Sequence, residues 1–373
     1  MNVLVAGDFV PKLEVEEKIN NGIWKDIFGG IKNDIIQSDL SVINLECPIV
    51  ENDTAPIAKV GPNIKCSKNV GPLLKYAGFN LVTLANNHFL DYGESAAVTT
   101  MKVLKECGLD YVGGGTNLED ASKIYYYKKD KETLAIINCC ENEFSIATEN
   151  TAGSNPLNPV AQWYAIQEAS QKADYVLVIV HGGHELFQFP SPRMQKLYHF
   201  FIDAGADVVV NHHQHCYSGY EVYKGKPIFY GLGNFCFPNY KKESVLWNEG
   251  YMVKILFPSI EFQVIPYKQV SGNVNVVMLA GDEKKEFFDN IKVINEKISD
   301  EELLKKEFGE LVGRKEKIYL LNFIPFPLHK LNNRLILKVF LSKKRLLRCL
   351  NIIRCESHRD IMIESIKNHI ERL

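Results

Sequence analysis

Short apolar runs that end in metal-binding types of side chain are the feature that most constrains the fold of this chain. The runs at 3–6, 41–45, 80–84, 175–180 and 208–210 are each followed by such a side chain: Asp8, Glu46, His88, His181 and His213. Each run is short and bounded by turn-forming or polar residues, so it is predicted to be a buried β-strand. Helical segments separate the runs, at 70–76, 96–107, 161–172 and 194–204. Strands that alternate with helices predict a layered α/β fold with the helices outside the sheet.

The side chains at the ends of these runs are expected to meet, because α/β folds bind ligands beyond the carboxyl ends of their strands. The candidates at that edge are Asp8, Glu46, Asn87, His88, His181, His213 and His215. Carboxylates, an amide oxygen and imidazoles form a mixed set that suits Zn, Mn or Fe better than Ca or Mg. The set exceeds the needs of one tetrahedral ion, so we expect one or two divalent transition-metal ions as the cofactor.

The densest group of candidates lies at 211–215, Asn-His-His-Gln-His, directly after the apolar run Val208–Val210. In an extended chain, residues two apart point to the same side, so His213 and His215 are predicted to converge. His184, His199 and His212 are predicted not to bind metal. A polar loop without a ligand role is the alternative for this stretch by itself.

Each candidate also has an ordinary structural explanation when it is taken alone. Asp8 could cap a helix, Glu46 could be a surface carboxylate, and His181 could be a satisfied polar side chain at a strand end. Metal binding is the preferred interpretation only for the whole group, because ligand types that gather at one edge indicate a site.

Composition places the chain among globular proteins and excludes some functions. Its 373 residues are 46% hydrophobic and carry a net charge of −2, which argues against nucleic-acid binding. The nine cysteines show no CxxC spacing and are expected to be reduced thiols, mostly in the core. The sequence opens on Met-Asn-Val-Leu-Val-Ala-Gly-Asp without a signal-peptide pattern, and no apolar run is long enough to span a bilayer. We therefore expect a cytoplasmic protein.

Several short motifs, in this order within residues 1–240, together resemble one known family. They are Gly7-Asp8, Asn44-Leu45-Glu46, Ala85-Asn86-Asn87-His88, Asp91-Tyr92-Gly93, the spacing of His181, Gly183 and Glu185, Ala204-Gly205-Ala206-Asp207 with His213-Gln214-His215, and Gly231-Leu232-Gly233-Asn234-Phe235. The set resembles the bacterial capsule-synthesis CapA family, which is associated with poly-γ-glutamate production. That family belongs to the calcineurin-like metallophosphoesterase superfamily, so the resemblance implies a layered α/β/β/α sandwich.

The resemblance also implies a role for each matching residue. The metal ligands would be Asp8 and His215 for a first ion, Asn87, His181 and His213 for a second, and Glu46 as the bridge between both. His88 would be the catalytic acid or a phosphate-facing donor. Glu185 and Asn234 would orient the ligands. The implied activity is metal-dependent hydrolysis of a phosphoester that serves biosynthesis of a capsule or another anionic cell-surface polymer.

The sequence departs from the superfamily pattern at Val10, where a histidine ligand to the first ion is usual. CapA-like chains commonly share this difference. Gly182, Asn211 and Gln214 also replace more usual residues, and they are expected to change loop stiffness rather than ligands. Two alternatives stay open: a non-catalytic assembly or binding protein, and a metal-dependent amide hydrolase acting on a γ-linked polymer.

Residues 1–272 are predicted to form the main domain and residues 273–373 a helical, basic extension. Basic and apolar residues interleave at 314–354, which is typical of a helix on an anionic membrane surface, at the inner membrane face. A helix packed on the core with a basic outer face is slightly preferred to this membrane contact, and nucleic-acid binding ranks third. The loops at 48–68 and 142–160 are expected to form the walls of the pocket, and the second is expected to be a surface lid or loop.

Overall fold

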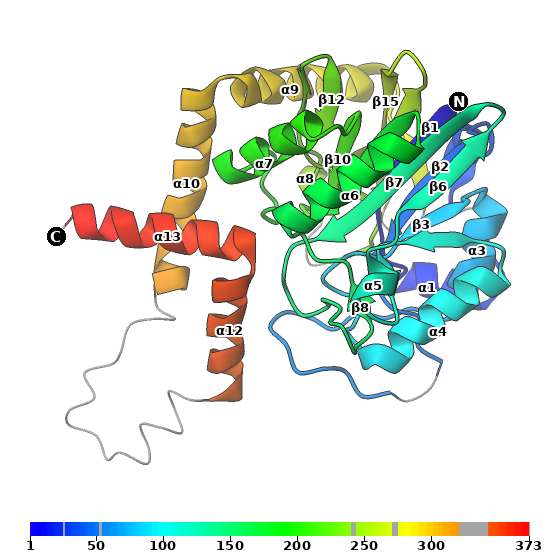
Figure 1. The fold of residues 1–373 in the computed structure, drawn as a ribbon, viewed down its shortest axis with the longest axis horizontal. Coiled ribbons are helices and arrows are strands. Elements are labelled where there is room, and N and C mark those ends of the chain that lie inside the picture. The colour runs from blue at the N-terminus through cyan, green and yellow to red at the C-terminus, as the bar shows by residue number, and fades with distance from the viewer. Residues whose placement is uncertain (25–26, 52–53, 240–243, 271–274, 321–341, 373) are drawn as a thin grey trace.

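The computed structural model describes residues 1–24, 27–51, 54–239, 244–270, 275–320 and 342–372, which form two β-sheets with helices around them (Figure 1). The first sheet has the order β16-β15-β14-β1-β2-β3-β4, and β13 also pairs with β1. Its strands are β1 Asn2–Phe9, β2 Leu40–Leu45, β3 Leu81–Thr83, β4 Asp110–Val112, β13 Asn234–Cys236, β14 Glu249–Leu256, β15 Glu261–Val270 and β16 Asn275–Met278. Strands β1 to β4 and β13 run parallel, which brings their carboxyl ends to one edge.

The second sheet has the order β11-β12-β10-β9-β7-β6. Its strands are β6 Tyr125–Lys129, β7 Glu132–Cys140, β9 Tyr175–His181, β10 Val208–His212, β11 Tyr220–Tyr223 and β12 Lys226–Phe229. Strands β7, β9, β10 and β12 are parallel. A separate pair joins β5 Gly114–Gly115 to β8 Gly153–Ser154.

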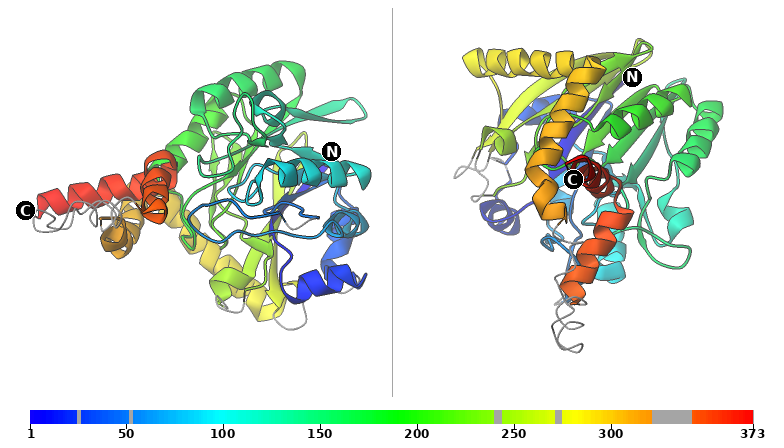
Figure 2. Two further views of the ribbon diagram at one scale, coloured as in Figure 1. Left: turned by 90° about the horizontal axis from the view of Figure 1, so that it is seen from below. Right: turned by 90° about the vertical axis from the view of Figure 1, so that its left-hand side faces the viewer.

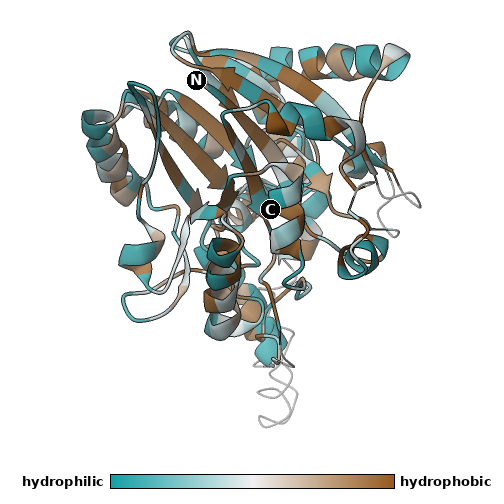
Figure 3. Ribbon diagram, turned by 90° about the vertical axis from the view of Figure 1, so that its right-hand side faces the viewer, coloured by the Kyte–Doolittle hydropathy of each residue, from teal (hydrophilic) through white to brown (hydrophobic). Residues whose placement is uncertain are grey.

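Alternation along the central strand β1 divides the hydrophobic core into two parts. Val3 and Val5 belong to the cluster between the two sheets, whereas Leu4 and Ala6 belong to the cluster on the outer face of the first sheet. Successive side chains of a strand point to opposite faces, so a strand buried on both faces is apolar throughout. The central strands of both sheets are accordingly hydrophobic along most of their length (Figure 3). The predicted α/β/β/α layering is confirmed.

Helices cover both outer faces of the sandwich. The first sheet is covered from the N-terminal half by α1 Glu14–Asn20, η1 Gly29–Ile31, α2 Lys32–Ile36, α3 Val70–Ala77 and α4 Gly93–Glu106. The second sheet is covered by α6 Pro159–Lys172 and α7 Pro192–Asp203. Short helices α5 Leu118–Ala121 and α8 Val245–Asn248 lie in connections. Between α1 and β2 the chain forms η1 followed directly by α2, and residues 25–26 lie outside the described part.

The loop at 142–160 is not the surface lid that its polar composition suggested. Ser145, Ala152, Ser154 and Asn155 are buried. The Ser154 hydroxyl also contacts the backbone at Asn86, with its Oγ 3.1 Å from the carbonyl oxygen. Polar residues of this loop therefore support the neighbouring loop that carries Asn87 and His88, because buried polar groups need hydrogen-bond partners.

The C-terminal helices are α9 Gly281–Ser299, α10 Glu301–Leu320, α12 Lys343–Arg354 and α13 Glu356–Glu371. Helix α9 packs on the sandwich through Phe287, Ile291 and Ile298, while α10, α12 and α13 gather beyond one end of it (Figure 2). The predicted domain boundary at 272 and the central part of the basic segment, 321–341, fall outside the described residues. No helix in the described ranges combines the length and the apolar character needed to cross a membrane.

Candidate metal centre

The predicted ligands come from the strand ends of both sheets, which meet at one edge of the sandwich. In the first sheet, Asp8 lies in β1 beside Asn44 of β2 and Asn234 of β13. In the second sheet, His181 at the end of β9 is paired with His212 at the end of β10. The parallel register therefore delivers residues that are far apart in the sequence to one buried cluster.

Glu46 lies at the centre of this cluster. Its side chain is fully buried, and among the described residues neither carboxylate oxygen has a hydrogen-bond partner. His181 Nε2 and His215 Nε2 lie 3.5 and 3.6 Å from Glu46 Oε1, and His88 Nε2 lies 4.0 Å away. Burial raises the pKa of Glu46 well above its usual value, and the negative charges of Asp8 and Glu185 raise it further. A buried carboxylate left without partners is costly, so the cluster suits a bound cation.

The ligand atoms form two groups that share Glu46. One group is Glu46, His181 and His213, and the other is Asp8, Glu46 and His215, with the ligand atoms of each group within 4.8 Å of one another. Asn87 adjoins the first group, because its Oδ1 lies 3.1 Å from His181 Nε2. The structure thus brings together all six predicted ligands in the two sets that the resemblance implied. The residues present fit two divalent ions bridged by one carboxylate.

Asp8 is held in place by a polar network that sequence analysis did not identify. The Asn44 amide donates a 2.7 Å hydrogen bond to Asp8 Oδ1, and His212 Nδ1 lies 3.2 Å from the same oxygen. Burial by itself would raise the pKa of Asp8, but the close His212 ring and the nearby His181 and His215 lower it well below its usual value. His212, predicted not to bind metal, lies in neither ligand group. Its contact instead keeps Asp8 ionised, as ligation requires.

His213 and His215 converge for a different reason from the predicted one. Strand β10 ends at His212, and both histidines have left-handed backbone conformations, with φ of 91° at His213 and 54° at His215. Such angles are uncommon for residues with a side chain, and they store strain. The rings end up 5.9 Å apart between centroids and face different ligand groups. Strained backbone of this kind tends to occur at functional sites.

The ring of His215 is oriented by Asn234, as predicted for that residue. Asn234 Oδ1 lies 2.9 Å from His215 Nδ1, and its amide donates to the His215 carbonyl. This leaves His215 Nε2 directed to the ligand group. Burial lowers the pKa of His215 to about 4 and that of His181 well below its usual value. Both rings are therefore neutral at pH 7, the form that binds metal. Glu185 is exposed and lines the pocket beside the cluster.

His88 is held by an ion pair that sequence analysis also missed. His88 Nδ1 lies 2.6 Å from Asp91 Oδ2 and 3.0 Å from Lys59 Nζ, and Lys59 forms a buried salt bridge with Asp91. Burial lowers the pKa of His88, as does Lys59, and Asp91 opposes both. Asp91 could have been found as the i+3 neighbour of His88, but nothing in the sequence marks Lys59 in the loop 48–68. The Nε2 side of the ring faces Glu46 and the pocket.

The fold is a layered α/β sandwich, and two groups of carboxylate and histidine side chains that share Glu46 lie at its strand ends. These features define a protein with a candidate dinuclear metal site. The chain belongs to the family described as bacterial capsule synthesis protein PGA_cap, whose profile matches residues 2–239. It is 34% identical over 245 residues to the capsule biosynthesis protein CapA of Bacillus anthracis, and 33% identical over 235 residues to the PGA biosynthesis protein CapA of Bacillus subtilis.

These matches cover 64% and 62% of this chain, and the chain spans only 60% and 62% of those two relatives. Among solved structures, a phosphatase from Mycoplasma pneumoniae is similar over 78% of this chain and 98% of that chain, with 16% identity and a TM-score of 0.43. A putative 5'-nucleotidase from Staphylococcus aureus is similar over 77% of this chain and 58% of that chain, with 14% identity and the same score. Scores this low say nothing of function.

Proposed function

We propose that this chain is a metal-dependent hydrolase of the phosphoesterase type that serves biosynthesis of a capsule or another anionic cell-surface polymer. The observation that carries the proposal is the buried carboxylate of Glu46, which has no hydrogen-bond partner in the described part of the chain and is shared by two groups of ligand atoms. Membership of the capsule synthesis family supports the biological setting. The relatives named for capsule and PGA biosynthesis support the same setting.

Each of these residues would have a separate role in such a reaction. Asp8, Glu46 and His215 would hold one ion, and Glu46, Asn87, His181 and His213 the other. A bound pair of divalent ions supplies a water of lowered pKa and a clamp for phosphoryl oxygens. His88 would give a proton to the leaving oxygen from Nε2, while its Nδ1–H donates to Asp91, which is paired with Lys59. The negative charge of a bound phosphoester raises the pKa of His88 and so favours its protonated form.

The proposal is tested by metal analysis of the purified protein together with hydrolysis of bis-p-nitrophenyl phosphate in Mn, Zn or Fe. We expect one or two ions per chain and metal-dependent turnover. Bound metal without turnover would favour the non-catalytic alternative. Cleavage of a γ-linked amide without cleavage of the phosphoester would favour an amide hydrolase.

His88→Ala is expected to lower kcat by about 10²- to 10⁴-fold, the usual contribution of a general acid, and to leave the metal content unchanged. The reason is that His88 Nε2 lies 4.0 Å from Glu46 but belongs to neither ligand group. Parallel kinetics and metal analysis check this outcome. A matched loss of metal would show instead that His88 is a ligand.

A non-catalytic binding or assembly protein is the second candidate, and Val10 is the observation that favours it. Val10 is fully buried in the hydrophobic cluster beside the first sheet, at the place where the superfamily pattern puts a ligand. The group of Asp8, Glu46 and His215 therefore has three ligands from the described residues, one fewer than the superfamily pattern supplies, and would hold its ion less firmly. A purified protein that binds one ion firmly and hydrolyses no phosphoester would favour this second candidate.

A further inference from the structure

Two adjoining cavities lie beside the candidate metal centre. The inner cavity, about 270 Å³, is lined by Asn87, His88 and His213 of the metal centre, and also by Lys315, Tyr319 and His358 of the C-terminal helices. The outer cavity, about 460 Å³, shares Val60, Tyr319, Asn351 and His358 with the inner one. Because four lining residues are common to both, the two cavities adjoin each other at the Tyr319 and His358 side chains.

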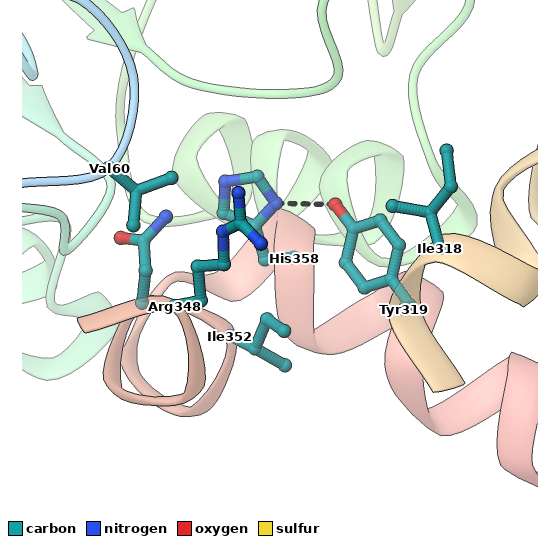
Figure 4. A pocket seen from close by; sticks show the side chains of 7 residues that line it. Val60, Ile318, Tyr319, Arg348, Ile352 and His358 are labelled. Carbon is teal, nitrogen blue, oxygen red and sulfur yellow. Dashed lines mark hydrogen bonds between the residues drawn. The ribbon is translucent and has the colours of Figure 1, made fainter. Parts of the chain in front are cut away.

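The partition between the cavities is one hydrogen-bonded pair. The Tyr319 hydroxyl of α10 lies 2.5 Å from His358 Nδ1 of α13. Figure 4 shows this pair, with Ile318 beside Tyr319 and with Arg348 and Ile352 of α12 on the side of His358. All these residues follow residue 239, where the match to the family profile ends. The outer cavity is therefore a feature that the C-terminal helices add to the family's part of the chain.

A buried ionic network fixes α13 against the loop that follows His181. Glu141, after β7, accepts hydrogen bonds from the Gly183 backbone at 3.2 Å, the Ser357 hydroxyl at 2.5 Å and Arg193 at 2.6 Å. Arg193 also binds Asp360 of α13 at 2.7 Å. One carboxylate thus links the metal centre's loop to the first turn of α13. Charge-assisted bonds of this kind fix orientation as well as position.

An apolar cluster fixes α10 to the same part of the molecule. Phe187, three residues after His184, packs in one cluster with Phe308, Val312, Tyr319, Ile352 and Ile361 of the C-terminal helices. The His184 ring also lies 5.6 Å from the Phe308 ring. These contacts place the wall of the pocket on rigid elements, as a binding site requires.

The lining of the outer cavity indicates what it would bind. Val60, Ile318 and Ile352 provide apolar surface, Asn351 provides an amide, and the exposed Arg348 guanidinium stands at its border. An apolar chain that ends in an oxyanion matches this combination, because guanidinium groups bind carboxylate and phosphate well. The inner cavity alone is smaller than a usual ligand pocket, whereas both together reach the usual range.

We propose that the outer cavity is a second substrate subsite, which binds the leaving-group side of a phosphoester through an apolar chain and a distal anionic group recognised by Arg348. Tyr319 and His358 stand between this subsite and the reacting group, and they are positioning residues for the chain that passes them. The inference rests on the proposed function, and it names the substrate class as a phosphoester whose leaving group carries a second negative charge.

The test measures binding of non-hydrolysable probes to the full-length, metal-loaded protein by calorimetry. The probes are alkylphosphonates of increasing chain length and the matched ω-carboxyalkylphosphonates. In the wild type, we expect the carboxylate to improve binding by about tenfold once the chain is long enough to reach Arg348. Arg348→Gln should remove that gain and leave binding of the plain alkylphosphonates unchanged.

Two further variants distinguish a specific effect on the subsite from a general loss of structure. Ile318→Trp, at a residue that lines the outer cavity and not the inner one, narrows the outer cavity and should abolish the dependence on chain length, while binding of inorganic phosphate is kept. Lys343→Gln removes an exposed cation at the start of α12, outside the lining of both cavities, and should match the wild type.

Hydrolysis of p-nitrophenyl phosphate, measured beside binding, distinguishes the two proposals. Turnover by the wild type with no effect of the carboxylate, or with an equal effect in Arg348→Gln, would refute the subsite and leave the hydrolase standing. A carboxylate effect that depends on Arg348 without any turnover would refute the hydrolase and leave the subsite standing. A wild type that binds none of the probes would overturn the subsite.

Discussion

Glu46 is the residue on which the chemistry of the centre depends most. Its fully buried carboxylate is surrounded by three imidazoles and has no hydrogen-bond partner among the described residues. Burial, Asp8 and Glu185 all raise its pKa, so the metal-free protein favours the protonated form. Bound cations reverse this preference, which couples metal affinity to pH and to folding.

Glu46→Gln should therefore have opposite effects with and without metal. Metal content should fall by at least one ion per chain, because the shared ligand loses its charge. In metal-free protein, a raised folded-state pKa means that wild-type stability falls as pH rises above about 4.5, the usual value for Glu. The neutral variant lacks this loss and should be more stable at pH 7 by about 1 kcal/mol. Metal analysis and urea unfolding across pH check both effects, and a metal-free variant less stable than the wild type would contradict the assignment.

Among the elements, the position of helix α13 depends on one buried carboxylate, that of Glu141. Several partners converge on Glu141, and although burial would raise its pKa, Arg193, Ser357 and the Gly183 backbone lower it to about 2. A lowered pKa adds stability that is complete above the usual value of 4.5 and is lost as pH falls from there toward 2. The docking of α13 is therefore acid-sensitive.

Glu141→Gln should loosen α13 at every pH where the wild type holds it, by about 3 kcal/mol, because Arg193 keeps its charge and loses a partner. Hydrogen exchange of the α13 amides measures this loosening, and lowering the pH of the wild type toward 2 should reproduce it. Glu149→Gln, at an exposed position of the same connection, serves as the control. Equal protection of α13 in both variants would rule out this anchoring role.

Strand β13 joins the metal centre to the aromatic core on the outer face of the first sheet. Asn234 orients His215, and the next residue, Phe235, is fully buried among the rings of Phe28, Phe79 and Tyr267. Centroid distances of 5.3 to 5.8 Å place all three rings in contact with it. The aromatic packing around Phe235 thus supports the position of Asn234 and, through it, the orientation of His215.

Phe235→Ala should lower the free energy of unfolding by about 3–5 kcal/mol, the usual cost of removing a buried aromatic ring. Val245→Ala, at a side chain that is 64% exposed in the following helix, should change it by less than about 0.5 kcal/mol. Urea unfolding of both variants provides the comparison. A small loss at Phe235 would mean that the surrounding rings close the space it leaves.

At the scale of the whole molecule, α12 presents two different faces. Arg348, Asn351 and Ile352 border the outer cavity, while Leu346, Leu350 and Ile353, at helical spacing on the opposite side, are 46 to 60% exposed. An exposed apolar stripe on a basic helix is typical of a membrane-surface contact. Contact with an anionic membrane through 314–354 stays a prediction, and residues 321–341 of that segment lie outside the described structure.

Replacement of Leu346, Leu350 and Ile353 by Asp should abolish co-sedimentation with anionic liposomes, because the charges oppose burial in the interface and repel the lipid. Val160→Asp, at a side chain that is 66% exposed on α6, should leave it unchanged. Both variants should keep p-nitrophenyl phosphate turnover. Liposome binding by the triple variant at the wild-type level would exclude this helix as the contact.

The sequence alone determined the strands, their layered arrangement and the six ligand candidates, because apolar runs encode burial locally and parallel strands bring their ends to one edge. Only the tertiary structure decided the partners of those ligands. Lys59 reaches His88 from a loop without regular structure, His212 contacts Asp8 across 204 residues of chain, and His213 turns into the site through a left-handed backbone. The wall made by α10 and α13 was equally unpredictable. Such contacts depend on how distant elements pack, and no local pattern of residues records that packing.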